Sequence, residues 1–263
     1  MPISLGNTSI NSLQLGSTSI NKAYLGEELV FGGGIDLSSS IISYYNFDNN
    51  VNDQKGSNNG IPTSLQYSNV RTGAINSYAN AALTITPSVE IASYDLNFGD
   101  GLTDEPFSFS FGIANGGAGT SVILTRRDGV NYEYQYVISS NNHLLRLIDG
   151  NSLSNRLEVT WNPVGIINPT VFESVTWTYD GSGSENGINV YHQGILQTVA
   201  RSTIGTYVAM DNTGSSTWLF KNGPTQGNHY RGELDEIYFY NKELTQEEVT
   251  FVSDEFNAGR TLI

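Results

Sequence analysis

The sequence contains no cysteine, which excludes a disulfide framework, a thiolate metal site and a cysteine nucleophile. Basic residues are scarce, since 12 Lys and Arg stand against 26 Asp and Glu and leave a formal net charge of −14. Binding to nucleic acid needs a clustered basic face, so nucleic acid is not expected as a partner. No apolar run approaches the roughly 20 residues of a membrane-spanning helix. The opening MPISLGNTSI also lacks the basic and apolar segments of a signal peptide. We therefore expect neither membrane insertion nor a cleaved leader.

Charged residues of both signs are few, at 14% of the chain against about 25% in an ordinary soluble domain. Glycine is abundant at 28 residues and tyrosine at 15. Asn, Ser and Thr must therefore solvate much of the surface. This composition predicts an acidic, strand-rich protein of one large domain with a small additional segment.

The additional segment is a ten-residue repeat at the start of the chain. ISLGNTSINS, LQLGSTSINK and AYLGEELVFG superimpose, and a large aliphatic residue recurs every five positions, at Leu5, Ile10, Leu15, Ile20, Leu25 and Val30. This period fits neither a helix nor a simple strand. Each repeat also contains a Leu-Gly pair, which we call its LG step, and Gly favours tight turns. We therefore expect strands of two to four residues joined by tight turns. Three such units bury too little surface to be stable alone. Their partner is either a larger assembly or the main domain of the same chain.

The segment Leu15–Gly26 (LGSTSINKAYLG) resembles short repeats that begin many tailed-bacteriophage virion proteins, among them fibre, spike and head-decoration proteins. The resemblance implies that residues 1–32 anchor the chain to other virion proteins of the capsid or tail. Residues 33–40 are then a Gly/Ser linker, and residues 41–263 an outward-facing domain. We expect a homo-oligomer on the exterior of the particle.

The rest of the chain consists of short β-type runs separated by Gly, Asn, Asp and Ser turns. The clearest runs are 41–47, 107–113, 121–126, 132–138, 144–149, 157–161, 174–179, 188–193 and 233–241. Several alternate strictly, as in Phe107, Phe109 and Phe111, which is typical of strands with one buried face. The pattern predicts an all-β antiparallel sandwich. Only one segment is helical, because Thr245 begins a capping box and Val249, Val252 and Phe256 share one face before Gly259.

Four motifs, in this order along the chain, resemble the laminin-G-like or concanavalin A-like jelly rolls. They are Ser43–Asp53 with Gly56–Gly60, Pro106–Phe111, Trp177–Gly181 with Asn189–Gly194, and Gly232–Thr245. The resemblance implies an antiparallel jelly-roll sandwich with one short C-terminal helix. One departure stands out, since Gly112 occupies a position where the family usually has an aromatic residue.

The same resemblance implies a structural Ca²⁺. In family members the first and last strands commonly share a calcium ion through an Asp after the Phe and an Asp of the terminal motif. The matching residues are Asp48 and Asp235, and Asp53 is a further candidate ligand. Carboxylates in Gly/Asn loops suit this hard cation. The alternative is that each Asp simply caps a turn.

An enzyme is not expected. The superfamily includes glycosidases with a Glu-x-Asp-x-Glu or Glu-x-Asp-x-x-Glu strand, but Ile237 and Tyr238 stand where the second Glu is needed after Glu233 and Asp235. In an unbroken strand Glu236 faces away from both. The histidines His143, His192 and His229 are far apart in the sequence and have no metal-ligand spacing.

Carbohydrate binding is the family's most frequent activity outside catalysis. Trp161, Trp218, Tyr207 and Tyr230 are suitable aromatic residues, although each also suits a core or cross-strand position. The sequence therefore does not identify the ligand-binding residues. It favours a bacteriophage virion protein whose anchored jelly roll adheres to surface glycans. The alternatives are a purely structural capsid or tail decoration subunit and, third, a secreted glycan-active enzyme.

Overall fold

The computed structural model describes residues 35–81, 86–114, 120–139, 142–150, 153–163, 170–225 and 227–263 with their side chains, and the backbone of six short strands between residues 4 and 31. The chain divides into two compact units, residues 1–39 and residues 40–263. Among the described residues, no helix has the length and apolarity that a membrane crossing requires.

The first unit contains three two-stranded antiparallel hairpins. They pair β1 (Ser4–Leu5) with β2 (Thr8–Ser9), β3 (Leu13–Leu15) with β4 (Thr18–Ile20), and β5 (Ala23–Leu25) with β6 (Glu28–Phe31). The short strands predicted from the repeat are thus confirmed, and the Leu of each LG step ends the first strand of its hairpin. Ile10 and the side chains of the other five repeat residues lie outside what the structure describes, so their anchoring role stays a prediction.

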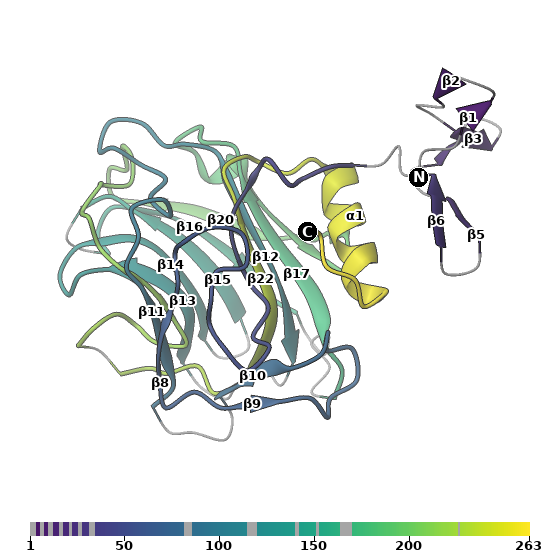
Figure 1. The fold of residues 1–263 in the computed structure, drawn as a ribbon. Coiled ribbons are helices and arrows are strands. Elements are labelled where there is room, and N and C mark those ends of the chain that lie inside the picture. Colours follow the sequence, from purple (N-terminus) through teal and green to yellow (C-terminus); the bar gives the residue numbers. More distant parts are fainter. Residues whose placement is uncertain are drawn as a thin grey trace. The chain divides into compact units, whose positions relative to one another are not determined.

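The second unit is a sandwich of two antiparallel sheets, shown in Figure 1. The first sheet contains β7 (Ile41–Tyr45), β9 (Tyr67–Ser68), β10 (Tyr78–Asn80), β12 (Phe107–Ala114), β17 (Glu173–Tyr179), β18 (Ile188–His192), β19 (Ile195–Leu196) and β22 (Glu233–Tyr240). The second contains β8 (Ile61–Thr63), β11 (Ser88–Ile91), β13 (Ser121–Arg127), β14 (Tyr132–Ser139), β15 (Asn142–Ile148), β16 (Arg156–Trp161), β20 (Ala200–Ile204) and β21 (Thr217–Leu219). The predicted jelly-roll sandwich is confirmed.

Aromatic side chains from both sheets meet in the core. Phe107, Phe109 and Phe111 of β12 face Tyr134 and Tyr136 of β14, with ring centres 5.6–6.1 Å apart. These alternating residues lie where their spacing predicts. Strand β12 is nevertheless buried on both faces, because the C-terminal helix covers Gly112, while Tyr240 and the segment before the helix cover Ser110 and Ser108.

That helix, α1 (Gln246–Asn257), begins as predicted. The Thr245 hydroxyl accepts a hydrogen bond from the Glu248 backbone N–H, and the Glu248 side chain accepts one from the Thr245 N–H, which completes the capping box. Gly259 ends the turn with a φ of +69°. Figure 1 shows α1 beside β17 and β12 of the first sheet.

Gly112 makes room for this helix. A Cβ added there would lie 2.2 Å from a ring carbon of Phe256. The aromatic residue usual at this strand position is therefore replaced by an aromatic ring supplied from the helix. Because the space is already filled, Gly112 has a packing role and does not weaken the family assignment.

Substituting Gly112→Ala should destabilise the fold by about 1–3 kcal/mol, because the added methyl group must displace the Phe256 ring. Urea unfolding measures the change. Gly227→Ala is the matched control, since a Cβ there meets nothing within 4 Å. Adding Phe256→Leu to Gly112→Ala should recover part of the loss, and equal effects of the two glycine substitutions would contradict this account.

Candidate functional site

The first and last strands of the sandwich lie side by side. Strand β7 pairs with β22 so that Tyr44 is opposite Tyr238, and their rings stack with centres 4.1 Å apart. Both hydroxyls donate to Oε2 of Glu236, at 2.5 Å from Tyr44 and 3.0 Å from Tyr238. The family motifs at the two ends of the domain thus meet in one structure.

Strand β22 is bulged at this point. Its pairing with β12 shifts between Asp235 and Tyr238, and Glu236 has a φ of +51°. As a result, Leu234 faces the core before the bulge and Ile237 is the next residue of the strand that does so. The strand is therefore not unbroken, contrary to the expectation from sequence, and the charge of Glu236 acts on the neighbouring Asp235.

The acidic residues of β22 have separate partners. Glu233 forms an ion pair with Arg71. Asp235 accepts hydrogen bonds from the backbone N–H of Ile75 and of Glu236, at 2.9 and 3.0 Å. Glu236 is held by the two tyrosines, and its Oε1 is buried with no hydrogen-bond partner among the described residues. These contacts hold the strand junction together.

Burial strongly affects the two adjacent carboxyl groups. Burial, and after it the charge of Glu236, raise the pKa of Asp235 well above its ordinary value. Burial also raises the pKa of Glu236 to about 7, although the hydroxyls of Tyr44 and Tyr238 act in the opposite direction. Two negative charges side by side in this setting are unfavourable unless a proton or a cation neutralises them.

The structure brings two of the three predicted calcium ligands together. Asp48 accepts a hydrogen bond from the N–H of Ser77 at 2.9 Å, and Asp235 accepts one from Ile75, two residues earlier in the same segment. The charge of Asp48 also contributes to the raised pKa of Asp235. Asp53 is engaged elsewhere, with the N–H groups of Tyr44, Lys55 and Asn58. Within the described ranges, no group of three acidic or histidine side chains is arranged as a set of metal ligands.

Two of the three histidines meet across the sandwich. The rings of His143 and His192 both contact Trp161, with centres 5.3 and 5.6 Å from the indole. Burial, and after it the charge of His192, lower the pKa of His143 to about 3, so His143 is neutral at neutral pH. His192 Nε2 is 3.2 Å from Glu173 Oε2. Their separation in the sequence concealed this grouping, because it depends on which strands face one another.

The candidate carbohydrate-binding aromatics lie in different environments. Trp161 and Tyr230 are core residues with 1% and 0% of their surface exposed. Tyr207 donates its hydroxyl to the buried Asp104 at 2.6 Å. Trp218 is also largely buried, at 9% exposed, but it forms a wall of a pocket. Of these four side chains, Trp218 is therefore the candidate for a ligand contact.

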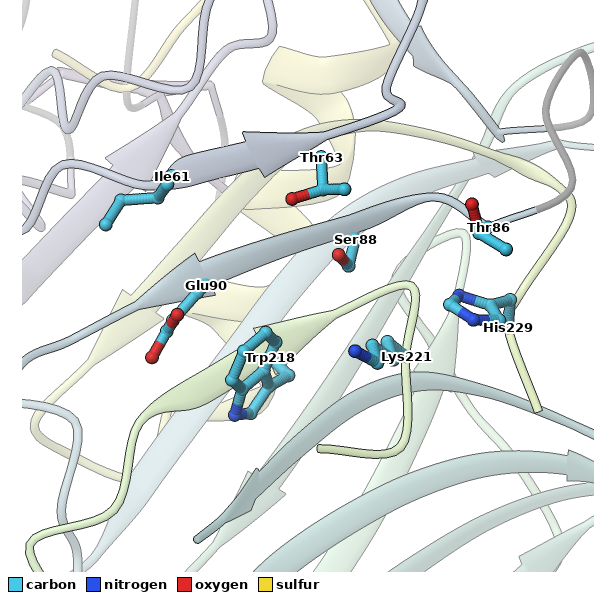
Figure 2. A pocket seen from close by; sticks show the side chains of 8 residues that line it. All are labelled: Ile61, Thr63, Thr86, Ser88, Glu90, Trp218, Lys221 and His229. Carbon is cyan, nitrogen blue, oxygen red and sulfur yellow. The ribbon is translucent and has the colours of Figure 1, made fainter. Parts of the chain in front are cut away.

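The pocket, which we call the Trp218 pocket, lies on the outer face of the second sheet and has a volume of about 330 Å³. Figure 2 shows its lining residues, which are Ile61, Thr63, Thr86, Ser88, Glu90, Trp218, Lys221 and His229. Alternate residues of β8 and β11 point into it, while Val89 and Ile91 between and beyond them enter the core. The cross-strand pairs Thr63–Ser88 and Glu90–Trp218 fix its floor.

Polar groups line this pocket in a defined arrangement. Lys221 Nζ lies 5.1 Å from the centre of the Trp218 ring and donates to the Pro224 carbonyl at 2.9 Å. Glu90 accepts from the Ser216 hydroxyl at 2.8 Å. His229 Nδ1 lies 2.8 Å from the Pro87 carbonyl. An aromatic wall with a few convergent polar groups is typical of small-molecule sites.

Most residues of this pocket are not predicted from the sequence. Strands β8 and β11 were not among the predicted runs, although Ser88-Val89-Glu90-Ile91 alternates polar and apolar residues. That alternation was a usable signal for the strand. No sequence signal indicated that β21 would pair with β11, since more than a hundred residues separate them.

Comparisons with known proteins agree with this architecture. A family model described as the concanavalin A-like lectin/glucanases superfamily matches residues 66–250. A search of curated proteins found no significant match.

Solved structures share the fold at low sequence identity. One is domain 4 of AbnA, a GH43 extracellular arabinanase from Geobacillus stearothermophilus, solved in complex with arabinotriose. It is 17% identical to this chain, the match covers 81% of this chain and 98% of that domain, and the TM-score is 0.59. The binding domain of Paraclostridial Mosquitocidal Protein 1 is 15% identical, with 84% and 53% covered and a TM-score of 0.62. The ligand-binding domain of botulinum neurotoxin serotype D, solved with N-acetylneuraminic acid, is 17% identical, with 82% and 51% covered and a TM-score of 0.57. This chain spans about half of each toxin domain.

Proposed function

The chain belongs to the concanavalin A-like lectin/glucanases superfamily, and from this membership and the Trp218 pocket we propose that it is a carbohydrate-binding protein. The pocket is the observation on which the proposal rests. Its volume of about 330 Å³ lies at the small end of the range for ligand sites, roughly 300–1,000 Å³. Its hydroxyl, carboxylate and ammonium groups suit the hydroxyls of a sugar, and the exposed part of its indole adds a small apolar contact.

The fold neighbours support this choice. Two of them were solved in complex with a carbohydrate, the arabinanase domain with arabinotriose and the neurotoxin domain with N-acetylneuraminic acid. Catalysis is not part of the proposal, since Glu233 is paired with Arg71 and Glu236 with two tyrosines.

We test glycan binding with the full chain on a glycan array, followed by titration of each hit. Trp218→Leu should weaken binding by about tenfold, because the indole borders the pocket and supports the Lys221 ammonium group over its ring, and a lost interaction of ~1.4 kcal/mol is a factor of ten. Glu90→Gln, which keeps the side-chain shape, should also weaken binding. Tyr94→Ser is the control, since Tyr94 is exposed and outside the pocket. An array with no hits would favour a purely structural decoration subunit.

We also propose that the protein is part of a bacteriophage virion, as a fibre, spike or head-decoration protein. Residues 1–32 would anchor it to other virion proteins, and the sandwich would face outward, with many copies raising the avidity for surface glycans. A homo-oligomer would achieve the same effect. The separate unit of three small hairpins supports this division of labour, because so little buried surface needs a partner.

Deleting residues 1–34 should abolish incorporation into virions. The melting temperature of the sandwich should stay the same, because residues 40–263 form a compact unit of their own. Sedimentation of particles, with calorimetry of the truncated chain, measures both. A truncated chain that still joins particles would place the anchor elsewhere.

A structural Ca²⁺ is the last part of the proposal. Asp48 and Asp235 would hold it, because the charge of Asp48 acts on the buried Asp235 carboxyl and helps to raise its pKa. Carboxylate oxygens are the ligands that Ca²⁺ prefers, and the ion would neutralise the adjacent buried acids. Asp53, with three N–H groups bound, is left out of the site.

Chelation should lower the melting temperature by roughly 5–10 °C, since a ligand at a hundred times its Kd stabilises a fold by about 2.7 kcal/mol. Calorimetry with EDTA and then with excess Ca²⁺ measures this shift. Asp48→Asn should remove the response to EDTA, whereas Asp53→Asn should keep it. A melting temperature indifferent to chelation would exclude the ion.

A further inference from the structure

The Trp218 pocket has opposite charges at its two ends. Figure 2 shows Glu90 and Ile61 toward one end and Lys221 and His229 toward the other, with Ser88 between them. Thr63, Thr86 and Ser88 also line the pocket, and their hydroxyls are uncharged hydrogen-bond donors and acceptors. A ligand that fills this pocket meets a cation and a carboxylate at separate positions.

Lys221 differs from most cations of the described chain. Arg71, Arg126, Arg146, Arg156, Lys242 and Arg260 each form an ion pair with a carboxylate. Within the described residues, no carboxylate lies at ion-pair distance from Lys221 Nζ, which instead binds a carbonyl and lies over an indole ring. A half-buried ammonium group with only these partners has capacity for an anion.

The same contact limits what Trp218 can do. Lys221 lies over the ring, and only 9% of the Trp218 surface is exposed. The indole therefore cannot serve as an open platform on which a neutral sugar ring stacks. Affinity at this end of the pocket must come mainly from the ammonium group and the hydroxyls.

We propose that the Trp218 pocket selects acidic sugars, with Lys221 bound to the carboxylate or sulfate of the ligand and Glu90 accepting hydrogen bonds from its hydroxyls. The inference rests on the proposed carbohydrate binding and specifies its ligand class. The net charge of −14 does not oppose it at physiological salt, because charges beyond about 8 Å are largely screened there, whereas the direct contact with the half-buried Lys221 is screened less.

Titration calorimetry of the full chain tests the proposal with three sets of probes: oligogalacturonate and a sialylated trisaccharide, the same two compounds after carboxyl reduction, and a sulfated trisaccharide. At least one acidic probe should bind about tenfold more tightly than its uncharged counterpart, and this preference should shrink as NaCl rises from about 0.05 to 0.5 M. The carboxylated and sulfated probes show which anion the pocket accepts.

Lys221→Met keeps the alkyl stem over Trp218 and removes the charge. It should weaken binding of the preferred acidic probe about tenfold and leave the reduced probe within twofold of wild type. Lys221→Arg should retain the preference. Lys55→Met is the matched control, since Lys55 is an exposed lysine outside the pocket.

The outcomes separate this inference from the proposed function. Equal binding of acidic and reduced probes, or a Lys221→Met variant that keeps the acidic preference, overturns the inference and leaves carbohydrate binding intact. Loss of binding to the reduced probe as well would mean that Lys221 acts through packing, which also overturns it. If no probe of any kind binds and the glycan array is empty, the proposed function and the inference both fall.

Discussion

The pairing of β7 with β22 is the constraint on which the rest of the sandwich depends. It joins the first and last strands of the body, places β22 inside the first sheet and buries all eight of its residues. Buried carboxylates are unfavourable without hydrogen-bond or ion-pair partners. Arg71, two tyrosines and backbone N–H groups supply these partners to the acidic residues of β22. The bulge at Glu236 allows this arrangement, because it turns the carboxylate toward Tyr44 while Ile237 remains in the core.

Closure of the first sheet also decides where a ligand can bind. Helix α1 follows directly after β22 and covers the outer side of β12 and β17, with Phe256 against Gly112. That face is therefore occupied by the protein itself. The Trp218 pocket lies on the outer face of the second sheet. Cross-strand pairs of β8, β11 and β21 form its floor, and Lys221 and His229 line one end of it. The two outer faces of the sandwich therefore differ chemically, because a helix covers part of the first sheet while the second sheet carries an open pocket.

Much of the fold could be predicted from local pattern. All nine predicted runs became strands within a few residues, and the capping box at Thr245 begins the helix. The nine runs do not include β8, β9, β10, β11, β19, β20 and β21, which are only two to five residues long, although β11 does alternate polar and apolar residues. For the site, sequence reasoning placed Asp48 near Asp235 through family motifs, but it could not distinguish Trp218 from Trp161. Both tryptophans sit in strand-like segments, and only the pairing of strands decides which one borders a pocket.

The class of structure and the chemistry excluded from it can be read from the sequence: a cysteine-free, acidic chain with a ten-residue repeat ahead of an all-β sandwich. Those properties follow from composition and from spacing along the chain, which are local quantities. Only the folded chain shows that Glu236 leaves the ladder, that Phe256 fills the space above Gly112, and that Lys221 lies over Trp218, the cross-strand neighbour of Glu90. Each of these depends on strand register and on contacts between distant segments, where a shift of one residue exchanges the two faces of a strand.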